Sequence, residues 1–122
     1  MNIEQNKIVE LLNKELSLSF PDYLGAYFYG SRLQGNFHGD SDYDVVLLFE
    51  SIEFEKESKI AGVVSLFQYK YDVIIDYILL TAGGKRSIEY MRQNINPVFI
   101  QRAIDKGKYY KRQPRTMARK LF

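Results

Sequence analysis

Three aspartates in two separate segments are the residues of this chain whose spacing first suggests chemistry. Asp42 and Asp44 stand two residues apart at the start of an apolar run, and Asp76 lies in a later run rich in β-branched residues. Because side chains alternate along a strand, Asp42 and Asp44 project to the same side. If the two runs are neighbouring strands, the three carboxylates converge and repel one another unless a divalent cation is present. Hard cations such as Mg²⁺ prefer oxygen ligands, so the spacing predicts a metal-binding cluster.

A glycine–serine pair, Gly30-Ser31, follows directly after another short apolar run. Glycine has no Cβ and therefore lets a second group approach the backbone closely. A serine that opens a helix presents its hydroxyl and the nearby N–H groups to an anion. A phosphate cradle of this kind beside a carboxylate cluster is suited to phosphoryl chemistry on a nucleotide.

The elements that must position these residues alternate between helix and strand. Ile8, Leu11, Leu12 and Leu16 follow the spacing of an amphipathic helix, and the unbroken apolar run at 45–49 is typical of a buried strand. Glutamates at the start of a later amphipathic segment favour the N-terminal turn of a helix. The elements predicted in this part are a helix at 3–18, a strand at 24–29, a turn-rich stretch at 35–41, a strand at 42–49, a helix at 53–70 and a strand at 72–80.

The remaining third of the chain is predicted to be a loop, an interrupted helix and a short strand. Residues 81–85 form the loop, Ser87 caps the helix, and Asn96-Pro97 interrupts it before it resumes at 98–103. Gly107 ends the helix, and 108–111 is a short strand. The whole order predicts an α/β (α+β) fold, in which a mixed sheet has helices packed against it.

The composition sets limits on the class of protein. With 122 residues, the chain has the length of one domain, and it contains no cysteine. A disulfide framework, a thiol nucleophile and a cysteine zinc site are therefore excluded. We see no signal peptide and no apolar run long enough to span a bilayer, so a cytoplasmic protein without membrane contact is expected.

Two other features are assigned minor roles. Asp72 shares its predicted strand face with Asp76, and we interpret it as a surface residue at the start of the strand and only a minor candidate ligand. Gly83-Gly84-Lys85 lacks the spacing of a Walker phosphate loop and a following serine or threonine, so it is predicted to be a turn.

The combined motif resembles that of a known family. It consists of Gly30-Ser31-Arg32-Leu33-Gln34-Gly35, then Ser41-Asp42-Tyr43-Asp44-Val45-Val46, and later Ile74-Ile75-Asp76-Tyr77-Ile78. This pattern is similar to the signature of the minimal nucleotidyltransferases of the DNA polymerase beta superfamily, and the resemblance covers residues from about 20 to 110. One departure is Leu33-Gln34, where the family often has Ala-Arg. This departure concerns the phosphate loop and leaves the aspartates unaffected.

The resemblance implies a role for each motif residue. Asp42 and Asp44 would hold two Mg²⁺ ions, and Asp76 would hold the ion that activates an acceptor hydroxyl. The nucleotide-binding set would comprise Gly30, Ser31, Arg32 and Gly35, with Gly30 and Ser31 on the β- and γ-phosphates. The expected reaction moves a nucleoside monophosphate, AMP, from an NTP, ATP, to a hydroxyl. The nucleotidyltransferase domain would span 1–110, and 111–122 would be a basic C-terminal tail.

The resemblance also implies a partner. Larger relatives carry an added domain that shapes the acceptor site, and this chain is too short for one. The acceptor is therefore expected on a partner, a second subunit of a homo-oligomer or a macromolecule. Minimal family members are often antitoxins paired with a helical HEPN toxin, and this is the leading setting. Two alternatives stay open: an antitoxin that acts by contact alone, and a nucleic-acid binder that uses the basic tail.

Overall fold

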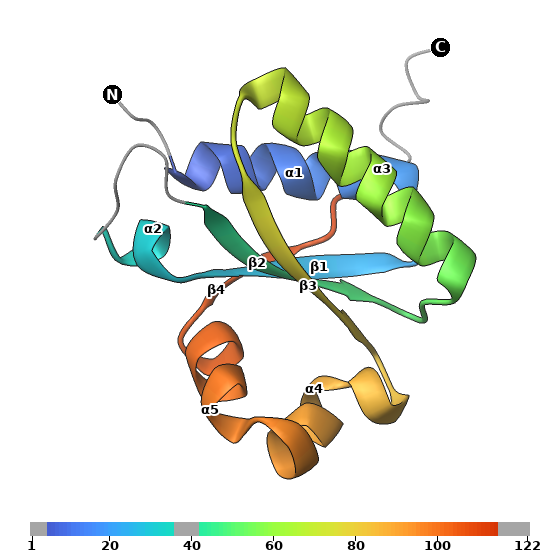
Figure 1. Cartoon of the computed structure of the whole chain (residues 1–122), viewed down its shortest axis with the longest axis vertical. Coiled ribbons are helices and arrows are strands. Elements are labelled where there is room, and N and C mark those ends of the chain that lie inside the picture. Colours follow the sequence, from blue (N-terminus) through green and yellow to red (C-terminus); the bar gives the residue numbers. More distant parts are fainter. Residues whose placement is uncertain (1–4, 36–41, 115–122) are drawn as a thin grey trace.

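A four-stranded sheet forms the centre of the computed structural model, which describes residues 5–35 and 42–114 (Figure 1). The strand order is β3-β2-β1-β4. β1 is antiparallel to β2 and β4, whereas β2 and β3 are parallel, so the predicted mixed sheet is confirmed. The strands are β1 (Tyr23–Tyr29), β2 (Tyr43–Phe49), β3 (Ile75–Thr81) and β4 (Lys108–Lys111).

The helix α3 (Phe54–Tyr71) connects the two parallel strands, which need a crossover of this kind. It ends at Asp72, which adopts the left-handed conformation with φ 55° and donates its N–H to the carbonyl of Gln68. The side chain of Gln68 then accepts a 2.7 Å hydrogen bond from the N–H of Ile75. The strand predicted from Asp72 therefore begins only at Ile75, and Asp72 is the cap of a helix rather than a strand residue.

Two long helices cover one face of the sheet. The helix α1 (Gln5–Ser19) buries Val9, Leu12 and Leu16 at the predicted helical spacing, and α3 lies beside it over the same face (Figure 1). The first two residues of the predicted helix at 3–18 lie outside the described residues. The buried residues of this larger cluster include Phe20, Tyr23, Phe28, Val45, Leu47, Phe49, Ile60 and Phe67.

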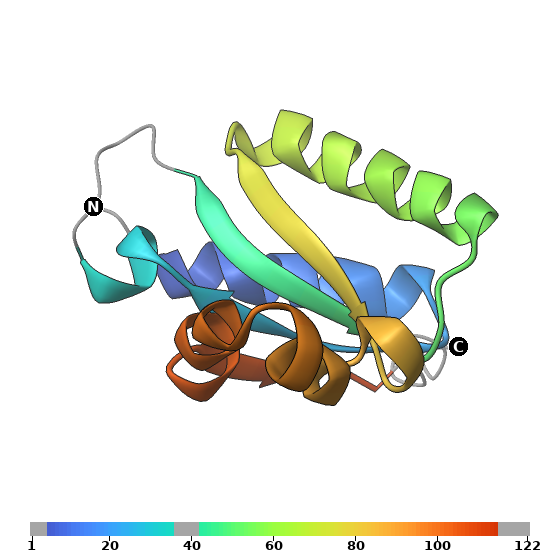
Figure 2. The same cartoon turned by 60° about the horizontal axis from the view of Figure 1, so that its bottom comes forward.

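Short helical segments cover the other face (Figure 2). Ser87 accepts a 3.0 Å hydrogen bond from the N–H of Tyr90, and Asn96 accepts one of the same length from Phe99, so both are helix caps. The helix predicted at 98–103 starts at Pro97 and continues to Asp105. These segments are the 3₁₀ turn η1 (Gly84–Arg86), α4 (Ile88–Tyr90), the π-helical η2 (Met91–Ile95), α5 (Pro97–Ile100) and the π-helical η3 (Gln101–Asp105).

The remaining predictions concern the loops and the C-terminus. Of the turn-rich stretch at 35–41 only Gly35 is described, and of the tail at 111–122 residues 115–122 lie outside the described part. Lys111 belongs to β4, and the N–H of Arg112 donates to the carbonyl of Leu24. The division of the chain at residue 110 stays a prediction. Among the described residues, no helix is long and apolar enough to cross a bilayer.

Candidate active site

Tyr29, Asp44 and Asp76 form a row across three neighbouring strands. Tyr29 of β1 is the register partner of Asp44 in β2, and Asp44 is the register partner of Asp76 in β3. Asp42 immediately precedes β2, two residues before Asp44. The sequence prediction required the second and third strands to be neighbours, and they are. Asp76 is the second residue of β3, so it lies at the start of the strand and not in its middle, where it was predicted.

The electrostatics of the row show that its carboxylates are close. Partial burial raises the pKa of Asp44 to about 6, and the charge of Asp76, a hydrogen bond with Asp76 and the charge of Asp42 act in the same direction. The positive charge of Arg102 opposes this shift. Burial and then the charges of Asp44 and Asp76 raise the pKa of Tyr29 to about 12. A bound cation would relieve the repulsion between Asp44 and the neighbouring carboxylates.

The fit of a metal ion can be judged from these donors. Within residues 5–35 and 42–114, no group of three or more histidine, cysteine or acidic side chains is arranged to hold a metal ion. The donor set is thus the pair of Asp44 and Asp76, with Asp42 adjacent. Mg²⁺ in phosphoryl-transfer sites is held by one or two carboxylates together with substrate phosphates and water. The donors fit such an ion, and the metal roles of the three aspartates stay a prediction.

The turn after β1 brings the backbone against this row. Gly30 has φ 88°, and a Cβ at this position would clash with Oδ2 of Asp44. Glycine is therefore required both by the backbone conformation and by the close approach of the carboxylate. Ser31 opens the one-turn helix α2 (Ser31–Gln34), an element absent from the predicted order, and Gly35 ends it with φ 86°.

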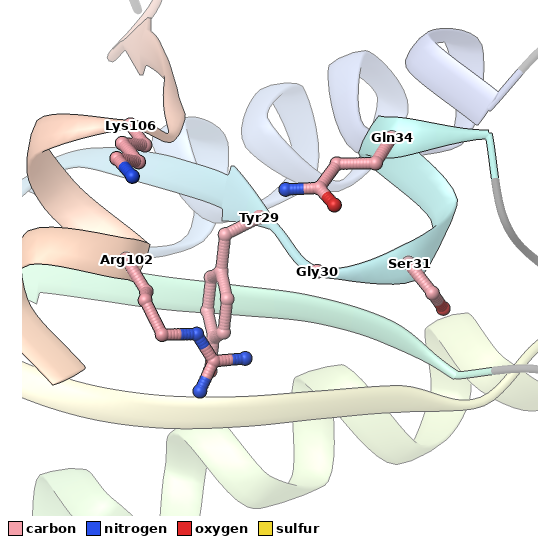
Figure 3. Close-up of a pocket in the computed structure, with 6 residues that line it drawn as sticks. All are labelled: Tyr29, Gly30, Ser31, Gln34, Arg102 and Lys106. Atoms are coloured by element: carbon pink, nitrogen blue, oxygen red, sulfur yellow. The ribbon is translucent and has the colours of Figure 1, made fainter. Parts of the chain in front are cut away.

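A pocket of about 410 Å³ opens beside this turn (Figure 3). In the figure, Arg102 extends alongside the ring of Tyr29, whereas Ser31 and Gln34 lie on the α2 side. The ring of Tyr29 packs edge-on against Phe99, with ring centroids 5.7 Å apart. The residues that line the pocket are Tyr29, Gly30, Ser31, Gln34, Arg102 and Lys106.

Arg32 is placed differently from the other residues of the motif. It is buried, its guanidinium lies 4.2 Å from the centroid of the Tyr43 ring, and it donates a 3.3 Å hydrogen bond to the Tyr43 hydroxyl. This contact fastens α2 to the start of β2. Neither Arg32 nor Gly35 lines the pocket, and their assignment to nucleotide binding stays a prediction.

Sequence reasoning missed four of the lining residues: Tyr29, Gln34, Arg102 and Lys106. A signal existed for two of them, because Arg102 and Lys106 are four residues apart in a helical segment and so share a face. Nothing in the sequence indicated that this face meets Gly30. That contact depends on how η3 packs against the sheet.

Comparison with known proteins identifies the family. The sequence pattern of the nucleotidyltransferase domain matches residues 8–109, which is most of the chain. This protein therefore belongs to the nucleotidyltransferase domain family. The carboxylate row and the Gly30-Ser31 turn both lie within the matched residues. Among curated proteins, none matches significantly.

Three solved structures with some similarity are distant from this chain. A Sulfolobus solfataricus protein assigned to the nucleotidyltransferases is 28% identical, with a TM-score of 0.44, over 63% of this chain and 69% of that one. A toxin–antitoxin with AMP-PNP is 17% identical, with a TM-score of 0.49, over 98% of this chain and 80% of that one. A mutant of the toxin–antitoxin MntA–HpeT is 15% identical, with a TM-score of 0.48, over the same shares. The family assignment rests on the sequence match alone.

Proposed function

We propose that this chain transfers AMP from ATP to a hydroxyl group on a partner protein, as the antitoxin of a HEPN/MNT pair. The observation that carries the transferase proposal is the register of Asp44 and Asp76 in neighbouring parallel strands, beside the Gly30-Ser31 turn. Membership in the nucleotidyltransferase family supports the reaction class. The need for a nucleoside triphosphate favours the cytoplasm as its location.

Each site residue has a role in this proposal. Asp42 and Asp44 would hold two Mg²⁺ ions, and Asp76 would share one of them on the acceptor side. When bound, the ions supply positive charge that stabilises the attacking and leaving oxygens. Asp44 is half-buried while Asp76 is exposed, so the acceptor is expected to approach over β3. Gly30 and Ser31 present backbone N–H groups and a hydroxyl to the β- and γ-phosphates.

The proposed step is one displacement at the α-phosphorus. A bond forms between the acceptor oxygen and the α-phosphorus, and the bond from the α-phosphorus to the oxygen that bridges to the β-phosphate breaks. Pyrophosphate leaves with that oxygen, and the hydroxyl proton passes to water. The residues of the site hold the triphosphate in line with the acceptor, which converts an encounter of two molecules into a positioned reaction.

The partner is proposed from the motif resemblance described above. The exposure of Asp76 supports an external acceptor, because its carboxylate is open to solvent on the side where the hydroxyl must arrive.

The test is label transfer from α-labelled ATP in the complex with the co-expressed partner, in the presence of Mg²⁺. The double variant Asp42→Asn/Asp44→Asn should lose transfer by at least about a thousandfold, because the charges that hold the ions are gone. Asp72→Asn is the matched control. Asp72 caps α3 in the left-handed conformation, which asparagine also adopts readily, so both folding and transfer should persist.

The same variants separate transfer from contact. If the double variant still neutralises the partner fully in cells, the chain acts by contact and catalysis is dispensable. If the wild-type protein labels neither the partner nor RNA with Mg²⁺ or Mn²⁺, the transferase proposal is wrong. Labelling of RNA alone would favour the nucleic-acid alternative.

A further inference from the structure

Two cationic side chains, Arg102 and Lys106, line the pocket from the side opposite to Gly30 and Ser31 (Figure 3). Within the described part of the chain, neither forms a salt bridge or a side-chain hydrogen bond, although Lys56, Arg86 and Arg92 all pair with acids. Cations that face a concave surface and are not held in an ion pair within the described residues can bind an anionic ligand.

The surrounding packing holds these two cations in place. Ile100 and Ala103 are fully buried and fix α5 and η3 against Val46 of β2. Arg92 of η2 forms a two-pronged ion pair with Asp105 of η3, with N–O distances of 2.7 and 3.0 Å. The helical segment that carries both cations is thereby fixed at its inner face and at its C-terminal end.

Gly107 allows the end of this segment to approach β1. A Cβ at Gly107 would clash with the carbonyl oxygen of Ala103 and would lie 3.0 Å from that of Phe28. The chain can therefore turn directly after Lys106 and enter β4 beside β1. Lys106 thereby lines the same pocket as Tyr29 and Gly30.

The chemistry of the lining selects the class of ligand. A guanidinium, an ammonium, an amide and a hydroxyl all offer donors to phosphate oxygens. The one aromatic side chain of the lining, Tyr29, packs edge-on against Phe99, and the other side chains of the lining are polar or charged. We propose that this pocket is a polyphosphate site, in which Arg102 and Lys106 bind the phosphates from the side opposite to Gly30-Ser31. The inference rests on the proposed function for the identity of its natural ligand, the triphosphate of an NTP.

The proposal assigns two residues that the sequence motif does not contain. Arg102 extends alongside the ring of Tyr29 (Figure 3), and Tyr29 is the register partner of Asp44, so Arg102 lies on the side of the carboxylate row. It is therefore expected to contact phosphate close to the reacting phosphorus. Lys106, one helical turn further on, is expected to contact the terminal phosphates. Substrate binding would then depend on α5 and η3 as well as on the turn after β1.

Calorimetric titration with tripolyphosphate in Mg²⁺ buffer tests the proposal without any transfer reaction. The double variant Arg102→Met/Lys106→Met should bind about a hundredfold more weakly, because charge-assisted hydrogen bonds are lost from two groups. The control Arg86→Met/Lys108→Met removes the same net charge outside the pocket and should change the affinity by less than about threefold. Arg102→Lys should retain part of the affinity. Thermal unfolding followed by circular dichroism checks that each variant is folded.

The outcomes are separable from those of the label-transfer experiment. Equal losses in the two double variants, or no binding of tripolyphosphate by the wild-type chain, would overturn the polyphosphate site even if AMP transfer is observed. Conversely, binding that depends on Arg102 and Lys106 in a chain that labels nothing would keep the site and remove the transferase.

Discussion

The two faces of the sheet differ in how they are built. The face under α1 and α3 is a continuous apolar core that includes three packed aromatic rings, those of Phe20, Tyr23 and Phe49. The face under α4 and α5 buries only a small cluster, which includes Val46 and Ile100.

The same strands serve both faces by alternation. Val45, Leu47 and Phe49 of β2 enter the large core, whereas Asp44 and Val46 point to the opposite face. We therefore expect the face under α1 and α3 to supply most of the stability, whereas the face under α4 and α5 carries the polar groups of the site.

The largest effect on folding is expected from the large core. Phe49→Ala removes a fully buried ring that packs edge-on against Phe20 and Tyr23 at centroid distances of 5.5 and 5.4 Å. The free energy of unfolding should fall by about 3–5 kcal/mol, measured by urea denaturation. The matched control is Phe54→Ala, because Phe54 is 83% exposed, and it should change stability by less than about 0.5 kcal/mol. Equal effects would contradict the division between core and surface.

The small cluster should respond differently. Ile100→Ala is expected to lower the free energy of unfolding by about 2–3 kcal/mol, since the residue is fully buried in a thin layer. Because the packing of Ile100 positions η3, and with it Arg102 and Lys106, this variant should lose more tripolyphosphate affinity than Phe49→Ala does. The comparison is made under conditions where both variants are folded. Ile95→Ala, at a position 59% exposed, should leave both quantities nearly unchanged. Unaltered affinity in Ile100→Ala would mean that the small cluster does not position the pocket.

A smaller effect on stability, with a larger one on activity, is expected at the Gly30 turn. Gly30→Ala places a Cβ on a backbone with φ 88° and ψ −165°, a conformation essentially restricted to glycine, and against the Asp44 carboxylate. It should therefore cost about 2 kcal/mol of stability and displace that carboxylate. Gly62→Ala on α3 meets open space and should instead stabilise the fold by about 0.5–1 kcal/mol. Thermal unfolding and label transfer measured on both variants check this contrast, which fails if Gly30→Ala keeps full activity.

The smallest effect is a pH dependence of stability that comes from the carboxylate row. The pKa of Asp44 is raised in the folded protein to about 6, so the folded state binds its proton more tightly than the unfolded chain does. Without metal, this group's contribution to stability should therefore be present at about pH 4 and decline as the pH rises to about 6. Denaturation curves in EDTA should show this decline in the wild-type protein and a weaker one in Asp44→Asn. An identical pH profile for the two proteins would contradict it.

Most of the elements could be predicted because local patterns determine them. Strand β4 spans the predicted residues Lys108–Lys111 directly after Gly107, and β2 begins within one residue of the prediction. The start of β3 was wrong by three residues. The left-handed turn at Asp72 and the Gln68 side chain extend the cap of α3 into a segment whose residues favour a strand.

The candidate site was predictable only in part, for a physical reason. The aspartates and the Gly30-Ser31 pair stand in a recognisable spacing, and parallel pairing of β2 and β3 brings Asp44 and Asp76 together. Arg102 reaches the site through the π-helical turn of η3 and the packing of Ile100, and neither leaves a periodic signal in the sequence. The guanidinium of Arg32 packs over the ring of Tyr43, a contact that the spacing of the motif does not reveal. Its predicted role in nucleotide binding stays a prediction.

The contact between Gly30 and the Asp44 carboxylate makes the effects of substitutions at these two positions depend on each other. While Asp44 is present, a side chain at position 30 meets both a steric clash and an unfavourable backbone conformation. Once Asp44 is replaced by a smaller residue, only the backbone cost of φ 88° and ψ −165° remains. In a lineage that abandons catalysis, loss of the aspartate should therefore precede loss of the glycine. Such a lineage is expected to include sequences that keep Gly30 and lack Asp44, whereas the reverse combination should be rare.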